Sequence, residues 1–166
     1  YLLTSTLVNS FEAGDMRKLA WVQSENFSGQ TIYYPYKYKI NFAPPVTEFY
    51  VALRLAEQYL IRAESRANID DFVGAQNDLN VIRNRAGLSN TTANDKTSLL
   101  RAIEHERQIE LFAEWGHRWF DLKRTGQANT VLGNLKPSTW EATDTLWPIP
   151  ESQIRLNPAL TQNAGY

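Results

Sequence analysis

Hydrophobic residues recur every three or four positions in the middle of the chain, and this period predicts two amphipathic helices. The two stripes are Leu53, Ala56, Leu60, Ala63 and Ala67, then Phe72, Ala75, Leu79, Ile82 and Ala86. The polar break between them offers Asp70 or Asp71 as an N-cap, and Gly87 is a natural C-terminal stop. Helices joined by so short a link pack antiparallel, so we expect a helical hairpin.

A third helix is predicted from Thr97 to Trp115, with the densest charge in the chain. Apolar residues lie nearly all round it, which is typical of a central helix whose charges are paired. Its charges continue beyond the helix at spacings of three or four: Arg107, Glu110, Glu114, Arg118, Asp121 and Arg124. They sum to zero, so we expect a self-neutralising ladder and assign structural ion pairs to Arg107, Glu110, Glu114 and Arg118.

Residues 1–46 are rich in turn formers and aromatic residues, which predicts loops and short strands. In "YYPYKYKI" the side chains of Tyr34, Tyr36 and Tyr38 share one face of an extended segment. This face is either a platform for a flat ligand or a ribbon packed on the helical body, and Tyr36 is our candidate contact if it binds.

Residues 127–166 follow the helical body of residues 47–126. Their glycines and prolines break up any long helix, and Trp140 lies in this loop-like stretch. An aromatic side chain on a loop either packs against the body or stacks on a sugar, and Trp140 is our second candidate contact. The tail "LWPIPESQIRLNPALTQNAGY" predicts a clasp over the helices, with Trp147 and Ile149 buried as anchors.

Composition and spacing argue against several chemistries. The net charge of −1 gives no attraction to nucleic acid, and without cysteine there is no thiolate metal site. Glu114 and His117 have Glu-x-x-His spacing, but a dimetal bundle needs a second such pair. Glu106, Glu110 and Glu114 could supply a glycosidase acid and base, but the neighbouring arginines favour ion pairs. Neither histidine lies near a nucleophile elbow, so we assign no catalytic residue, metal or cofactor.

Four segments, in order along the chain, carry a family resemblance. They are "LRLAEQYLIRAESRA", "LNVIRNRAGL", "ERQIELFAEWGHRWFDLKRTG" and the tail quoted above. Together they resemble the C-terminal part of the SusD/RagB family of outer-membrane nutrient-binding lipoproteins. The hairpin is also similar to one tetratricopeptide unit, with Ala63, Ala75 and Leu79 at matching positions. The expected fold class is mainly α: this hairpin and further helices, an extended and loop-rich N-terminal segment, and a Pro-rich C-terminal clasp, all within one SusD/RagB-like domain.

The resemblance implies capture of a nutrient rather than catalysis. Members bind an oligosaccharide or peptide ligand and deliver it to a TonB-dependent, SusC-like outer-membrane transporter. They are held at the cell surface by a lipid anchor, which here would lie on a segment upstream of this chain. A tetratricopeptide-like scaffold that binds only protein is the alternative, and a carboxylate-based glycoside hydrolase is a more distant third.

Overall fold

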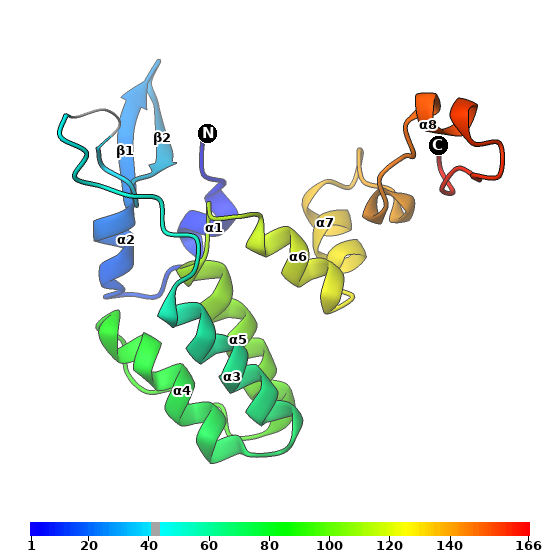
Figure 1. The fold of residues 1–166 in the computed structure, drawn as a ribbon. Coiled ribbons are helices and arrows are strands. Elements are labelled where there is room, and N and C mark those ends of the chain that lie inside the picture. The colour runs from blue at the N-terminus through cyan, green and yellow to red at the C-terminus, as the bar shows by residue number, and fades with distance from the viewer. Residues whose placement is uncertain (41–43) are drawn as a thin grey trace. The chain divides into compact units, whose positions relative to one another are not determined.

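The computed structural model describes residues 1–40 and 44–166, and the chain divides into two compact units. The first unit is Tyr1–His117 and the second is Arg118–Tyr166. Figure 1 shows the elements, most of which are helices, as expected for a mainly α chain. Within the part of the chain that the structure describes, every helix is too short or too polar to cross a membrane.

The first unit is built on α3 (Leu55–Asn68), α4 (Phe72–Arg85) and α5 (Lys96–Glu110), which pack side by side (Figure 1). The facing stripes are buried together in one core: Ala56, Leu60, Ala63, Ala67, Ala75, Leu79, Ile82, Leu99 and Ile103. Four of these are alanines, which let the helices approach closely. The predicted hairpin is therefore present, although Leu53 lies before α3 and is 80% exposed instead of joining the stripe.

The ends of these helices follow local side-chain chemistry. The carboxylate of Asp71 accepts a hydrogen bond from Gly74 N and starts α4, and Gly87 follows α4 with a φ of 80°. Asp95 and Ser98 form a capping box at the start of α5. We expected this helix to reach Trp115, but it ends at Glu110, and the chain then turns through residues with positive φ.

The N-terminal segment contains more helix than expected. α1 (Ser5–Asn9) and α2 (Met16–Trp21) precede an antiparallel hairpin of β1 (Val22–Phe27) and β2 (Gln30–Pro35). The strand stops at Pro35, so the alternation of Tyr34, Tyr36 and Tyr38 does not continue as a strand. A second small core of Phe11, Ile109 and Phe112 joins this segment to the end of α5.

The second unit contains all of α6 (His117–Arg124) except its first residue. It also contains α7 (Ala128–Leu135), the 3₁₀ helix η1 (Ala142–Thr145) and α8 (Glu151–Leu156). Its tail closes on itself, since Gln162 Nε2 donates to the Ile149 carbonyl (2.9 Å) and Tyr166 OH donates to the Leu146 carbonyl (2.9 Å). Our expectation of two buried anchors is wrong for Trp147, which is 77% exposed, while Ile149 is half-buried.

Candidate functional site

A buried cluster of charges lies in the first unit where α2, α3, α4 and α5 meet. Its centre is Glu110, which is fully buried and accepts hydrogen bonds from Arg17 Nη1 (3.0 Å) and Arg54 Nη1 (2.6 Å). Arg85 Nη2 lies 2.6 Å from the same carboxylate. Burial raises the pKa of Glu110, but the hydrogen bonds and charges of Arg85 and Arg54 outweigh it, and the pKa is lowered overall. Glu110 is therefore held as a carboxylate.

Two further carboxylates extend this ion cluster. Glu106 lies 2.6 Å from Arg17 Nη1 and 3.3 Å from Arg83 Nη1, and burial raises its pKa despite these cations. Glu114 accepts from Lys37 Nζ (2.7 Å) and from Arg54 Nε (2.9 Å). The pairs thus join different elements and do not run along one helix.

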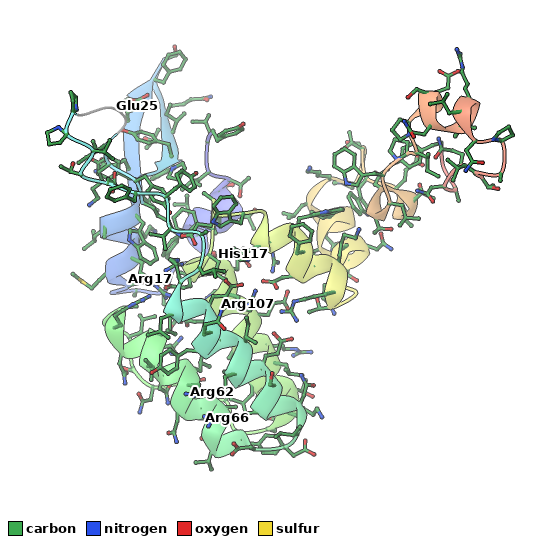
Figure 2. All side chains as sticks on the ribbon, viewed as in Figure 1. Arg17, Glu25, Arg62, Arg66, Arg107 and His117 are labelled. Carbon is green, nitrogen blue, oxygen red and sulfur yellow. The ribbon has the colours of Figure 1, made fainter. Side chains whose placement is uncertain are left out.

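The other charges of the expected ladder also make contacts of their own. Arg107 Nη2 lies 3.8 Å from Glu57 Oε1, and Asp121 pairs with Arg124 inside α6 (2.8 Å). Arg118 belongs to the second unit. Figure 2 shows Arg17 on α2 and Arg107 on α5. The helix α5 carries Glu106 and Glu110 of the cluster, and α4 carries Arg83 and Arg85.

An exposed aromatic surface lies beside the ion cluster. We call it the aromatic ledge, and it consists of Tyr38, Tyr50 and Trp115. The rings of Tyr38 and Tyr50 are stacked with centroids 4.5 Å apart, and Trp115 meets Tyr50 edge-on at 5.6 Å. Tyr50 is 70% and Trp115 55% exposed. A large apolar surface left open to solvent in this way is typical of an interaction site.

The backbone N–H and carbonyl of Val51 link the rings of Tyr38 and Trp115, which lie on either side of Tyr50 in the ledge. Val51 N donates to the Tyr38 hydroxyl (3.2 Å), and Trp115 Nε1 donates to the Val51 carbonyl (3.2 Å). The polar edges of both rings are therefore engaged, so their remaining free surface is apolar.

A cavity of about 470 Å³ adjoins the ledge and shares Tyr38 and Tyr50 with it. This volume lies in the range of small-molecule sites. Its other walls are mostly apolar and come from residues 1–3, the end of β2 and the turn after α5: Tyr1, Leu2, Leu3, Pro35 and Ala113. Among the described residues of this lining, the one charged side chain is that of Lys37.

Lys37 is turned away from solvent, and its side chain is only 8% exposed. Its ammonium donates to the Glu110 carbonyl (2.8 Å) and to Glu114, and lies 4.2 Å from the centre of the Phe112 ring. Burial lowers its pKa to about 8, although the hydrogen bond to Glu114 acts in the opposite direction. With its charge matched by Glu114, the lysine leaves the cavity suited to a neutral ligand.

The two contact residues predicted from the sequence lie in different units. Tyr36 is half-buried in the first unit, with Lys39 Nζ 5.2 Å from its ring centre. Trp140 is half-buried in the second, where its ring meets Trp119 edge-on at 6.2 Å and its Nε1 donates to Asn129 Oδ1 (3.1 Å). Ligand contact by either residue stays a prediction.

Sequence reasoning missed Tyr50 and Trp115. The available signal was "AEWGH", in which a tryptophan precedes a glycine between two charged helices. His117, which shares this segment, places Nδ1 3.5 Å from Glu57 Oε1. Across residues 1–40 and 44–166, there is no group of three or more acidic or histidine side chains that could hold a metal ion.

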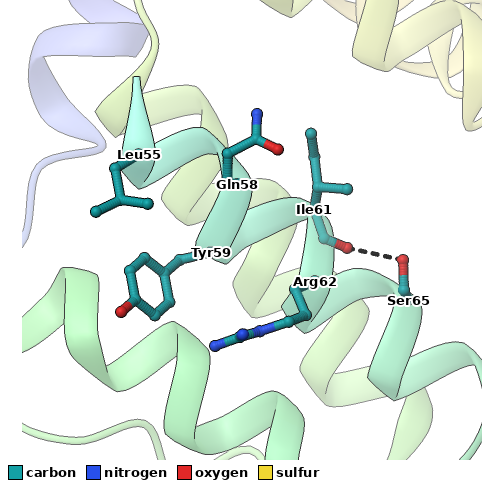
Figure 3. A pocket seen from close by; sticks show the side chains of 6 residues that line it. All are labelled: Leu55, Gln58, Tyr59, Ile61, Arg62 and Ser65. Carbon is teal, nitrogen blue, oxygen red and sulfur yellow. Dashed lines mark hydrogen bonds between the residues drawn. The ribbon is translucent and has the colours of Figure 1, made fainter. Parts of the chain in front are cut away.

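A second hollow, of about 450 Å³, runs along α3 (Figure 3). Its lining comes from one helix: Leu55, Gln58, Tyr59, Ile61, Arg62 and Ser65. Leu55 is 71% and Ile61 44% exposed, while Arg62 is bound to Asp78 on α4 (2.7 Å). This hollow has the composition of a contact surface for another helix or protein, and it lacks the stacked rings of the ledge.

These features define a mainly helical chain with an exposed aromatic surface beside a buried ion cluster, and sequence comparison gives the family. The sequence model of the SusD family matches residues 12–166, so the chain belongs to the SusD family. It is 32% identical over 139 residues to the SusD-like protein P38 of Formosa agariphila, covering 78% of this chain and 27% of that relative.

Solved structures show the same fold. A SusD superfamily protein of Bacteroides vulgatus is 30% identical with a TM-score of 0.70, over 92% of this chain and 36% of that one. A SusD-like carbohydrate binding protein of the same species is 27% identical with a TM-score of 0.65, over 76% of this chain and 28% of that one. The chain thus spans only about a third or less of each of these relatives.

Proposed function

We propose that the protein containing this chain captures glycans at the outer membrane and delivers them to a TonB-dependent, SusC-like transporter. The observation that carries the proposal is the aromatic ledge beside its apolar cavity. Sugar rings present flat C–H faces that pack on exposed aromatic rings, and their hydroxyls remain free for polar contacts. Family membership supports the same function, and one solved relative is described as carbohydrate binding.

The ion cluster supports capture without catalysis. A glycosidase needs one carboxylic acid that can donate a proton and a second carboxylate that is free to act. Here Glu110 and Glu114 are each engaged by two or more cations. Glu106, whose pKa is raised, is 1% exposed and has Arg17 and Arg83 against it. These carboxylates are placed to hold the fold together.

The experiment is a binding screen of the protein against neutral and acidic oligosaccharides and against peptides. For the best glycan, Trp115→Ala should weaken binding up to about tenfold, because a lost stacking contact is worth up to about 1.4 kcal/mol. Trp147→Ala removes another exposed tryptophan outside the ledge and is the matched control. Equal affinity of the Trp115→Ala variant and the parent would count against the ledge as a glycan site.

The hollow along α3 supports a second candidate, a scaffold that binds only protein. Exposed Leu55 and Ile61 offer apolar area for an incoming helix, as in stacked helical repeats. Under this alternative the screen finds no glycan or peptide ligand. Ile61→Glu then abolishes binding of the co-expressed transporter while Trp115→Ala has no effect on it.

A further inference from the structure

The aromatic ledge is built from segments without regular secondary structure, which raises the question of what holds its rings in place. Tyr38 and Tyr50 lie between β2 and α3, and Trp115 lies in the turn between α5 and α6. Each is close in sequence to a member of the ion cluster. Tyr38 follows Lys37, Trp115 follows Glu114, and Arg54 comes shortly after Tyr50.

A single carboxylate joins these three segments. Glu114 is 6% exposed, and each of its carboxylate oxygens accepts a hydrogen bond from a different residue. Oε1 accepts from Lys37 Nζ (2.7 Å) and Oε2 accepts from Arg54 Nε (2.9 Å). Charge-assisted bonds of this kind are short and directional. Glu114 therefore fixes the spacing between the backbone that carries Trp115 and the backbone on either side of Tyr38 and Tyr50.

The turn that carries Trp115 needs such a restraint. Ala113 and Trp115 have φ values of 56° and 43°, in the left-handed region that side chains other than glycine seldom occupy. Strained residues persist where the surroundings hold them, and they cluster at binding sites. Glu114 lies between the two strained residues, and its ion pairs hold the turn from within.

We infer that Glu114 is a positioning residue, which sets the aromatic ledge in its binding geometry through Lys37 and Arg54. This inference rests on the proposed function of the ledge. The inference assigns Glu114 a different role from Glu110, which binds Arg17, Arg54 and Arg85 at the centre of the unit. Arg54 keeps its bond to Glu110 when Glu114 is changed, so the helical core can remain folded while the ledge loosens.

The test uses Glu114→Ala, Glu114→Gln and Lys37→Met in the whole protein, with the best glycan from the screen. We expect the affinity to fall about tenfold for Glu114→Ala and less for Glu114→Gln, which can still accept a hydrogen bond. Near-ultraviolet circular dichroism of the unliganded protein should change in parallel, because ordered aromatic rings generate that signal. When Glu114→Ala is introduced into a protein that already carries Trp115→Phe, the tryptophan bands of the dichroism spectrum should change little.

Asp78→Asn provides the matched control. Asp78 is also a buried carboxylate held by two arginines, Arg62 (2.7 Å) and Arg66 (2.8 Å), but it lies in the α3–α4 hairpin. This variant should lower the melting temperature without altering glycan affinity or the tryptophan dichroism.

Unchanged affinity and unchanged dichroism in all three ledge variants would overturn the inference. If Glu114→Ala fails to fold, Glu114→Gln and Lys37→Met carry the same test. If the parent binds no glycan, the proposed function fails, and the dichroism alone decides whether Glu114 positions the ledge.

Discussion

Glu110 remains a buried carboxylate because three arginines, distant in sequence, converge on it. Arg17 lies 93 positions before it and Arg54 lies 56 positions before it. The charge spacing along the chain indicates a residue that needs partners. It cannot identify them, because Arg107 at i−3 satisfies the same pattern and the true partners depend on how α2, α3 and α4 pack against α5.

The first prediction concerns the loss of this carboxylate. Glu110→Ala would leave Arg17, Arg54 and Arg85 close together without their shared anion, and Arg17 is buried. We expect the free energy of unfolding to fall by about 3–5 kcal/mol, the range for breaking a buried pair. Urea unfolding followed by far-ultraviolet circular dichroism measures this change. Glu151→Ala, which breaks an exposed pair with Arg155, should change stability by less than about 1 kcal/mol, and equal effects of the two variants would contradict the prediction.

A second prediction follows from Lys37, whose pKa is lowered by burial to about 8, against 10.5 for the free side chain. Below pH 8 both folded and unfolded chains carry the proton, so Lys37 gives no pH dependence there. Between pH 8 and 10.5 the unfolded chain binds more protons, so stability contributed by this group rises with pH. The expected slope is up to about 1.4 kcal/mol per pH unit.

The measurement compares the parent with Lys37→Met by urea unfolding at pH 7, 8, 9 and 10. The difference in unfolding free energy should shift in favour of the parent as pH rises above 8, although the lysine is losing its charge. The groups that face its ammonium are Glu114, Glu110 and Arg54. Lys39→Met, which removes an exposed ammonium, reports the background. If the difference in unfolding free energy between the parent and Lys37→Met stays constant or falls as pH rises above 8, Lys37 is well solvated.

At the scale of elements, the sequence was most informative where the helical period is uninterrupted. The α3–α4 hairpin follows from its alanine and leucine stripes and from Asp71 and Gly87 at its ends. The end of α5 could not be predicted from the sequence, because apolar and charged residues continue at helical spacing beyond Glu110. Only backbone angles at Ala113 and Trp115 reveal the turn. The same turn exposes Trp115, so an error in one helix boundary also hid part of the candidate site.

The tail shows a second limit of element-level reasoning. Its prolines correctly exclude a long helix, but α8 still forms between them, starting directly after Pro150. Its polar residues bond back to the same tail, as Gln162 does with Ile149. Proline spacing does not indicate which surface a tail packs on, and the 77% exposure of Trp147 could not be read from its size and apolar character.

At the scale of the whole molecule, ledge, cavity and ion cluster all lie in the first unit, whereas Trp140 lies in the second. The family resemblance correctly identified the fold, because it depends on the order of several motifs. It did not locate the ledge, because Tyr38, Tyr50 and Trp115 come from three segments that meet only after folding. A candidate site assembled in this way requires the structure.

The last prediction separates the two units by their tryptophans. Trp140 is half-buried, meets Trp119 edge-on and donates to Asn129, so its loss should destabilise the second unit. We expect Trp140→Ala to lower the melting temperature and leave glycan affinity unchanged. Trp115→Ala should weaken glycan binding and leave the melting temperature unchanged. Calorimetric melting and glycan titration of both variants measure the two effects. If Trp140→Ala weakens glycan binding at an unchanged melting temperature, Trp140 is a contact residue, and the second unit takes part in capture.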